Sequence, residues 1–249
     1  MVATALMGKA LESLGSQVIL GVLSRRHRFL LWFRTAILGR RSKLRVSMAA
    51  VLRISCPQGY LLVESDSRKG IVGPIGGALK FWPGGQDSLD ALGFSAELRN
   101  KDEDTNDLRG FIRGGRLMEF LRWFEKGVGR ELGPLCVRRE ILEEVPEIRD
   151  RPELVVELAR AEIRRVGLSL VGPQVEGPEN QLVFRAIEIY ELCAGRSAAG
   201  QVQAWLLGLT NSKRRAVIAT REEIERGHLP DGTGFASHTK VVLGLDHTV

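Results

Sequence analysis

The sequence predicts an α/β fold, an α/β/α sandwich around a mixed sheet. Runs of β-branched and apolar residues at 44–54 and 182–190 predict strands, because such side chains suit a pleated, partly buried surface. Between these runs, apolar residues recur at i, i+3, i+4 and i+7 over 117–124, the spacing of one face of a helix. A chain of 249 residues with 44% apolar content can bury one substantial core.

The remaining elements of the first half follow from local patterns. A second β-rich run at 60–64 comes after the turn signal Cys56-Pro57-Gln58-Gly59, which predicts a hairpin with the first strand. Residues 97–109 are almost wholly polar and predict an exposed loop. The glycine-rich stretch 110–115 lacks the spacing of a phosphate-binding loop and is interpreted as a turn.

The second half continues the alternation of helix and strand. Leu154–Arg165 is predicted to be helical, and the strand at 182–190 is followed by a shorter strand at 216–219. Thr220 is then expected to cap a helix together with Glu223, three residues later, in a capping box.

Cysteine usage and hydropathy indicate the cellular compartment. The three cysteines, Cys56, Cys136 and Cys193, lie far apart, so neither a disulfide framework nor a zinc cluster is expected. No uncharged apolar run is long enough to cross a membrane. We therefore expect a cytoplasmic protein.

The first 45 residues are strongly basic. They contain nine Lys or Arg and one acid, Glu12, so their net charge exceeds the +6 of the whole chain. Aromatic and aliphatic residues interleave with the arginines, which predicts a basic amphipathic helical segment over 1–42. Three roles are open: packing on the core, lying on an anionic membrane surface, or contacting nucleotide phosphate. The near absence of a linker after Ile37 favours packing, and no sequence-specific nucleic acid is expected.

The stretch Arg139-Glu140-Ile141-Leu142-Glu143-Glu144 carries the chemistry of the chain. At about 100° per residue, the three glutamates project from one third of a helix circumference. Crowded carboxylates repel one another unless a cation lies among them, and Mg²⁺ (or Mn²⁺) prefers such oxygen ligands. Pro146 is expected to stop the helix, since the residue before a proline is pushed out of the helical region.

This stretch resembles the helical half of the Nudix box, and Glu131, with seven residues between it and Arg139, fits the preceding glutamate of that box. The resemblance has two departures, because Glu125 and Pro146 stand where Nudix boxes carry glycine. A Gly-Gly pair normally lies just before the box. Gly76-Gly77 suits that position, with Gly84-Gly85 as a rival, and either pair implies an insertion inside the box.

The split box is similar to the SMODS-associated Nudix domains over residues 43–243. The matching segments are Lys43–Ser47, Leu52–Ile54, Gly59–Val63, Pro74–Gly77, Asp107–Arg109, Phe120–Phe124, Arg130-Glu131 and Ser237–Lys240. The resemblance implies a Nudix-like α/β/α sandwich over 43–249, with an insertion at about 86–130 and a separate N-terminal helical segment. It also implies a bacterial anti-phage setting (CBASS) with a cyclic-oligonucleotide synthase as operon partner.

The resemblance further implies roles for single residues. Glu140, Glu143 and Glu144 would hold Mg²⁺ or Mn²⁺, Arg139 would orient Glu140, and Glu131 would support them. Gly76 and Gly77 would contribute backbone groups to the same site. The implied activity is hydrolysis of a nucleoside-diphosphate-linked substrate, with a non-catalytic sensor of a cyclic oligonucleotide, or an assembly or membrane-associated effector, as alternatives. His238, in the motif near the C-terminus, is open between a structural hydrogen bond and a nucleotide contact.

Overall fold

The computed structural model describes residues 42–64, 69–97, 106–195, 197–211 and 216–244. The predicted basic helical segment at 1–42 therefore lies almost wholly outside the described residues.

Within the described residues, two sheets share the core. The larger has the strand order β6 (Ser95–Ala96), β7 (Arg109–Arg113), β1 (Lys43–Leu52), β9 (Gln181–Leu192) and β8 (Ile163–Glu176), with β5 (Gly76–Ala78) also paired to β1. The smaller has the order β10 (Ala216–Ala219), β3 (Gly59–Glu64), β4 (Ile71–Gly73) and β11 (Gly234–Phe235), with β2 (Ser55–Cys56) beside β3.

The larger sheet is mixed, as predicted. Strands β1 and β9 run parallel from Leu44↔Leu182 to Leu52↔Tyr190, whereas β5, β7 and β8 pair antiparallel with their neighbours. The helices are α2 (Pro83–Ala91), α3 (Leu117–Lys126), α4 (Gly133–Glu144), α5 (Pro152–Arg160), α6 (Ser197–Gly208) and α7 (Arg221–Arg226). Short 3-10 turns at Gly114–Arg116, Pro146–Ile148, Leu209–Asn211 and Thr239–Leu243 connect or follow them.

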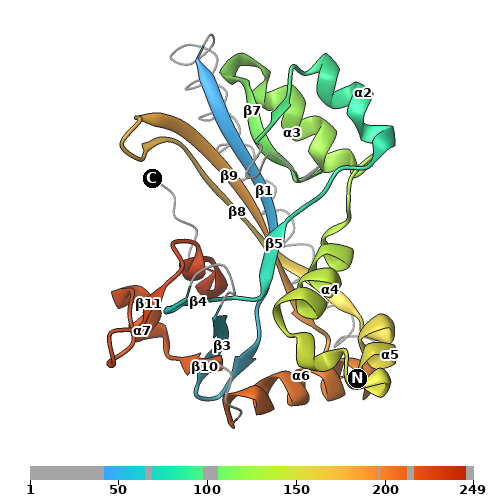
Figure 1. The fold of residues 1–249 in the computed structure, drawn as a ribbon, viewed down its shortest axis with the longest axis vertical. Helices are drawn as coiled ribbons and strands as arrows, with labels where there is room; N and C mark the ends of the chain where they lie inside the picture. The colour runs from blue at the N-terminus through green and yellow to red at the C-terminus, as the bar shows by residue number, and fades with distance from the viewer. Residues whose placement is uncertain (1–41, 65–68, 98–105, 196, 212–215, 245–249) are drawn as a thin grey trace, which may run out of the picture.

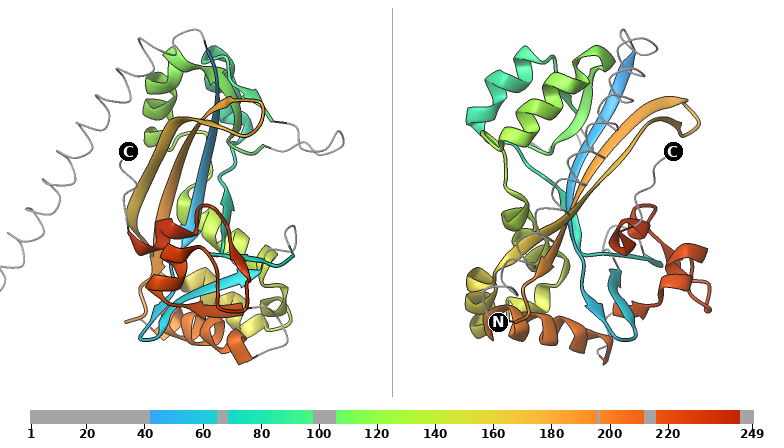
Figure 2. Two further views of the ribbon diagram at one scale, coloured as in Figure 1. Left: turned by 90° about the vertical axis from the view of Figure 1, so that its left-hand side faces the viewer. Right: turned by 180° about the vertical axis from the view of Figure 1, so that it is seen from behind.

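Helical elements cover both faces of the larger sheet (Figures 1 and 2). Alternate residues of β1, such as Val46 and Met48, enter a core shared with α3 and α4. On the opposite face, Val51 packs with Ile224 of α7 and with Val241 of the last 3-10 turn in a second core. This period-two division of side chains confirms the predicted α/β/α arrangement.

Several predicted elements are confirmed. The helix over 117–124 is α3, and its four periodic apolar residues are buried. The strands at 182–190 and 216–219 are β9 and β10. The Thr220 hydroxyl accepts from the Glu223 N–H and the Glu223 carboxylate accepts from the Thr220 N–H, so the predicted capping box is present.

Three predictions from local pattern are right only in part. The turn after Cys56 does close a hairpin, but it joins β3 to the two-residue strand β2, while β1 belongs to the other sheet. In the glycine-rich stretch predicted as a turn, Gly114 and Gly115 lie in a 3-10 turn, but Gly110–Arg113 belong to strand β7. A Cβ atom at Gly110 would lie 2.3 Å from the Ser95 carbonyl oxygen. The helix predicted to reach Arg165 ends at Arg160, because Ile163 already pairs with Leu192 of β9.

The segment that contains the predicted insertion begins and ends at neighbouring positions, Lys80 and Glu131. The Lys80 N–H donates to the Glu131 carboxylate at 3.2 Å, and the Glu131 N–H donates to the Lys80 carbonyl at 2.8 Å. Between them, α2, β6, β7 and α3 pack at one end of the sheet (Figure 1). Their aromatic contacts, Phe81 on Phe94 and Phe94 on Phe120, continue the main core.

Candidate metal and nucleotide site

Helix α4 presents the glutamates to the sheet. It begins at Gly133, where a Cβ atom would lie 2.0 Å from the Tyr190 hydroxyl, so only glycine allows the helix to start this close to β9. The helix ends at Glu144, before Val145 and Pro146, as predicted. Its inward face is apolar at Val137 and Ile141, which are fully buried. The glutamates are therefore fixed by the packing of the opposite face.

Arg139 lies at the centre of a carboxylate cluster, which we define as Glu131, Glu140, Glu143 and Glu144. Its guanidinium donates to Glu131 at 3.0 and 3.1 Å, to Glu140 at 2.7 Å and to Glu143 at 3.2 Å. It also donates to the Ala78 carbonyl of β5 at 2.9 Å. Burial alone would lower the pKa of Arg139, but its hydrogen bond to Glu131 and the charge of Glu140 raise the pKa above its ordinary value. Arg139 is thus a permanent cation that orients three of the four carboxylates.

The pair Gly76-Gly77 faces this cluster. A Cβ atom on Gly77 would lie 2.0 Å from Glu140 Oε1, so the carboxylate occupies the space that a side chain would need. The Gly76 N–H donates to Glu144 Oε2 at 3.1 Å. The rival pair, Gly84-Gly85, lies in α2 and does not line the site. Of the two pairs, the structure brings Gly76-Gly77 to the glutamates.

Glu140 carries the clearest electrostatic perturbation in the cluster. Its burial raises the pKa of the carboxyl above the ordinary value of 4.5, the Arg139 charge lowers it, and the neighbouring Glu143 raises it again. A buried carboxylate with a raised pKa is short of positive charge. The four carboxylates are hard oxygen donors, which fits Mg²⁺ or Mn²⁺.

The side chains of the carboxylate cluster are not arranged to coordinate a metal ion. Among the residues that the structure describes, no group of three or more His, Cys, Asp or Glu is arranged to hold an ion. The side chain of Glu143 is 48% exposed, and Arg139 holds it through one nitrogen. Glu143 can therefore turn toward a cation with little loss of packing.

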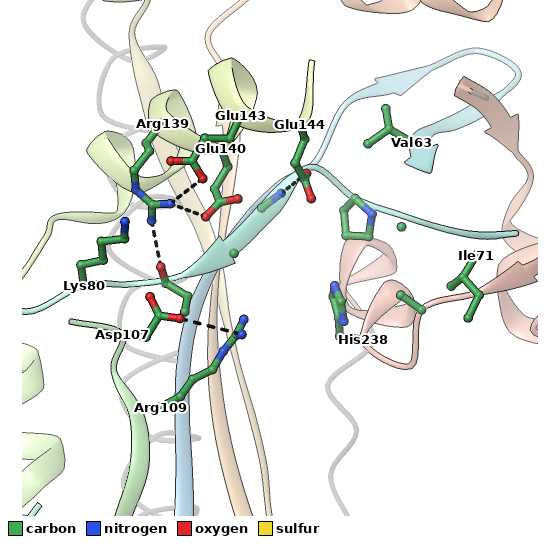
Figure 3. Close-up of a pocket in the computed structure, with 16 residues that line it drawn as sticks. Val63, Ile71, Lys80, Asp107, Arg109, Arg139, Glu140, Glu143, Glu144 and His238 are labelled. Carbon is green, nitrogen blue, oxygen red and sulfur yellow. Dashed lines mark hydrogen bonds and ion pairs between the residues drawn. The ribbon is translucent and has the colours of Figure 1, made fainter. Parts of the chain in front are cut away.

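The carboxylate cluster opens into a cleft of about 280 Å³ (Figure 3). Strand β5 and α4 form one wall. Lys80, Asp107 and Arg109 form a second wall, and residues of β3, β4 and the segment after β11 form the third. The lining residues are Val63, Ile71, Gly73, Pro74, Gly76, Gly77, Ala78, Lys80, Asp107, Arg109, Arg139, Glu140, Glu143, Glu144, Ala236 and His238.

The cleft also contains residues outside the predicted site. His238, for which a structural hydrogen bond and a nucleotide contact were both open, lies on the cleft wall. Asp107 and Arg109 lie in a segment that matched the SMODS-associated Nudix pattern, and this match was the available signal. Lys80 carried no signal, because it has no charged neighbour in sequence. Glu131 does not line the cleft, although it contacts Arg139 from behind.

Comparison with known families agrees with this geometry. The family model of the SMODS-associated NUDIX domain matches residues 43–243, most of the chain. The chain belongs to the SMODS-associated NUDIX domain family. No curated protein and no solved structure matches the sequence.

A second charged network lies behind the box of this NUDIX domain. We call Arg130, Glu188 and Tyr190 the buried ion network, since none of the three is more than 7% exposed. The Tyr190 hydroxyl donates to Glu188 at 2.9 Å, and an Arg130 nitrogen lies 3.6 Å from the other Glu188 oxygen. Arg130 also donates to the Phe124 carbonyl at 2.7 Å and to the Glu131 carbonyl at 2.8 Å. It therefore ties the end of α3 and the position of Glu131 to the central strand β9.

In the part of the NUDIX domain that the structure describes, no helix combines the length and the apolar character that crossing a bilayer requires.

Proposed function

We propose that this NUDIX domain is a Mg²⁺-dependent (or Mn²⁺-dependent) hydrolase of a nucleoside-diphosphate-linked substrate. The observation that supports the proposal is the Arg139-centred carboxylate cluster, which faces the Gly76-Gly77 backbone across an open cleft. The family assignment supports the same class of chemistry. We further propose a bacterial anti-phage nucleotide-signalling system as its setting, with a cyclic-oligonucleotide synthase as partner.

The residues of the chain divide the work. Glu143 and Glu144 are the proposed metal ligands, and Glu140 completes the set. When bound, Mg²⁺ would neutralise diphosphate charge and make a water molecule a better nucleophile. Arg139 lowers the pKa of Glu140 and orients its carboxylate, while the Glu131 carboxylate accepts hydrogen bonds from Arg139. Gly77 leaves room for the Glu140 carboxylate.

The proposed reaction breaks one phosphoanhydride bond. The oxygen of a water molecule bonds to one phosphorus, and the bridging P–O bond breaks, its electron pair leaving with the other phosphate. One proton of the water passes to Glu140, and the second stays on the newly formed phosphate. The raised pKa of Glu140 makes it a better proton acceptor than an ordinary carboxylate.

A substrate panel tests the proposal. Dinucleotides, nucleotide sugars and nucleoside triphosphates would be incubated with the full chain and Mg²⁺, and phosphate-bearing products would be quantified. Glu140→Gln should lower the rate of the best substrate by about a hundredfold or more. Glu153→Gln, an exposed glutamate of α5 outside the cleft, is the matched control. Turnover that survives in Glu140→Gln would contradict the proposal.

A specific observation favours a second candidate, a non-catalytic nucleotide sensor. Arg139 already engages three carboxylates, and the described residues form no finished metal group. A cyclic oligonucleotide has phosphodiester bonds and lacks the anhydride, so it would bind here without cleavage. Saturable calorimetric binding of a cyclic dinucleotide, with no product on the whole panel, would favour the sensor over the hydrolase.

A further inference from the structure

Two cations lie on the cleft wall next to the carboxylate cluster and have no part in the proposed chemistry. They are Lys80, which follows β5, and Arg109, the first residue of β7. Lys80 is partly exposed, and its ammonium group makes no ion pair with any residue that the structure describes. Figure 3 draws both side chains on the same side of the cleft, with Asp107 between them.

Strand pairing explains why these two cations lie together. Lys80 and Asp107 are partners in an antiparallel bridge, so their side chains project from the same face. Arg109 is two residues beyond Asp107 and shares that face. Lys80 and Arg109 are therefore diagonal neighbours across this bridge, and residues in such positions, typically about 7–8 Å apart or less, have side chains long enough to bracket one phosphate.

The surroundings fix the backbone of Lys80 and the side chain of Arg109. The backbone of Lys80 exchanges two hydrogen bonds with Glu131, at 2.8 and 3.2 Å. The Asp107 carboxylate lies 3.9 Å from Arg109, and both side chains are only about one-fifth exposed, at 22% and 21%. An arginine held in this way loses little conformational entropy when an anion binds.

The far side of the cleft has the opposite character. Val63, Ile71, Pro74 and Ala236 give it an apolar lining, to which His238 adds an imidazole ring. The cleft thus has a cationic end and an apolar end, with the glutamates of α4 between them (Figure 3). Such an arrangement suits an elongated ligand with a base at one end and negative charge at the other.

We propose that Lys80 and Arg109 form an anion subsite for a phosphate beyond the anhydride that is cleaved, while the nucleoside lies toward Val63, Ile71 and His238. The substrate class is then a nucleoside with at least three phosphates in line, either a triphosphate or a dinucleoside polyphosphate. This inference rests on the proposed function for the position of the anhydride. It adds a role for two residues, one of which the inserted segment contributes.

Calorimetry with inorganic probes tests the subsite without reference to the base. Pyrophosphate and tripolyphosphate differ by one phosphate, and each would be titrated in Mg²⁺ into the full chain. The wild type should bind tripolyphosphate about tenfold more tightly than pyrophosphate, the effect of one charge-assisted contact. Lys80→Met should abolish that preference while leaving pyrophosphate affinity nearly unchanged, and Lys80→Arg should keep it. Lys126→Met, an exposed lysine of α3 outside the cleft, is the control.

The outcomes separate this inference from the proposed function. A Lys80→Met variant that weakens both probes equally, or neither, would overturn the subsite, even if turnover still depends on Glu140. Conversely, a tripolyphosphate preference that depends on Lys80, in a protein without turnover, would support the subsite and contradict the hydrolase. If Lys80→Met lowers the melting temperature, Arg109→Lys and Arg109→Met make the same comparison.

Discussion

Two arginines of neighbouring segments, Arg130 and Arg139, lie in charged networks with opposite surroundings. Arg130 is 7% exposed and donates to two carbonyls, and its guanidinium lies 3.9 Å from the centre of the Phe124 ring. Arg139 donates to three carboxylates at the edge of an open cleft. In the buried ion network the charged groups have their partners inside the protein. In the carboxylate cluster the negative charges outnumber the one arginine among them. We infer that an ion network buried with its charges paired has a structural role, whereas an open one with unpaired negative charge has a functional role.

The largest expected effect is a loss of stability when a charge of the buried ion network is removed. Arg130→Met should lower the free energy of unfolding by about 3–5 kcal/mol, because Glu188 would remain buried without its buried cation. Arg165 is the matched control, since it lies equally far from Glu188, at 3.6 Å, but is 45% exposed. Arg165→Met should change stability by less than about 1 kcal/mol. Urea unfolding measures both, and equal losses would refute the distinction between the networks.

A second change tests whether the carboxylate cluster needs the present position of Glu140. Gly77→Ala places a methyl group where the Glu140 carboxylate lies, so catalysis should fall about a hundredfold, as when a catalytic carboxylate is misplaced. Gly84→Ala, in the rival Gly-Gly pair, is the control, because a Cβ there meets nothing within 4 Å. The rate per folded molecule is the measurement. If both variants keep full activity, Glu140 does not need its present position.

Metal binding provides a third comparison. At a concentration about 100-fold above its Kd, Mn²⁺ should stabilise the wild type by about 2.7 kcal/mol, or roughly 5–10 °C in Tm. Glu144→Gln should lose this shift and still fold, since its removal relieves repulsion on α4. The buried ion network offers no such site, so Tyr190→Phe should retain the Mn²⁺ shift. A metal response that persists in Glu144→Gln would argue against the assigned ligands.

The smallest effect concerns the metal-free protein. Burial raises the pKa of Glu140, so the folded state holds a proton there more tightly than the unfolded state. The contribution of Glu140 to the free energy of unfolding therefore falls as pH rises from about 4.5 through its folded pKa. Glu140→Gln should remove this penalty and raise Tm at pH 7 by a few degrees without metal. Thermal melts at pH 5 and pH 7 measure the effect, and a difference between variant and wild type that shrinks with pH would be the wrong sign.

The positions of site residues could be predicted from the sequence where they depend on helical periodicity. Glu140, Glu143 and Glu144 lie within one turn of α4, so their shared face follows from residue spacing alone. Gly76-Gly77 remained one of two choices, because what distinguishes the pairs is the Glu140 carboxylate, more than sixty residues later in the chain. The anion subsite and the buried ion network were missed for the same reason. Strand pairing brings Lys80 to Asp107 and packing brings Arg130 to Glu188, and neither contact leaves a local pattern.

The wrong predictions came from composition. Gly110, Gly114 and Gly115 suggested a turn, yet Arg109–Arg113 pairs along β1 over five residues. There, glycine permits the close approach of β6, a contact between strands that local propensity does not encode. Leu108, in a segment interpreted as an exposed loop, is fully buried, because its backbone pairs with Leu79 and with Met48 of β1.

The paired ends of the segment between Lys80 and Glu131 have a consequence for how this architecture can diversify. Lys80 pairs with Glu131, and Phe81 pairs with Arg130, so the segment between them closes on itself like the stem of a hairpin. The entropy of closing such a segment grows only with the logarithm of its length, about 0.6 kcal/mol for each doubling. Additions between α2 and α3 therefore need not displace the helix that carries the glutamates. We expect related chains to differ most in length inside this stem, while the two pairs that form it vary little in geometry.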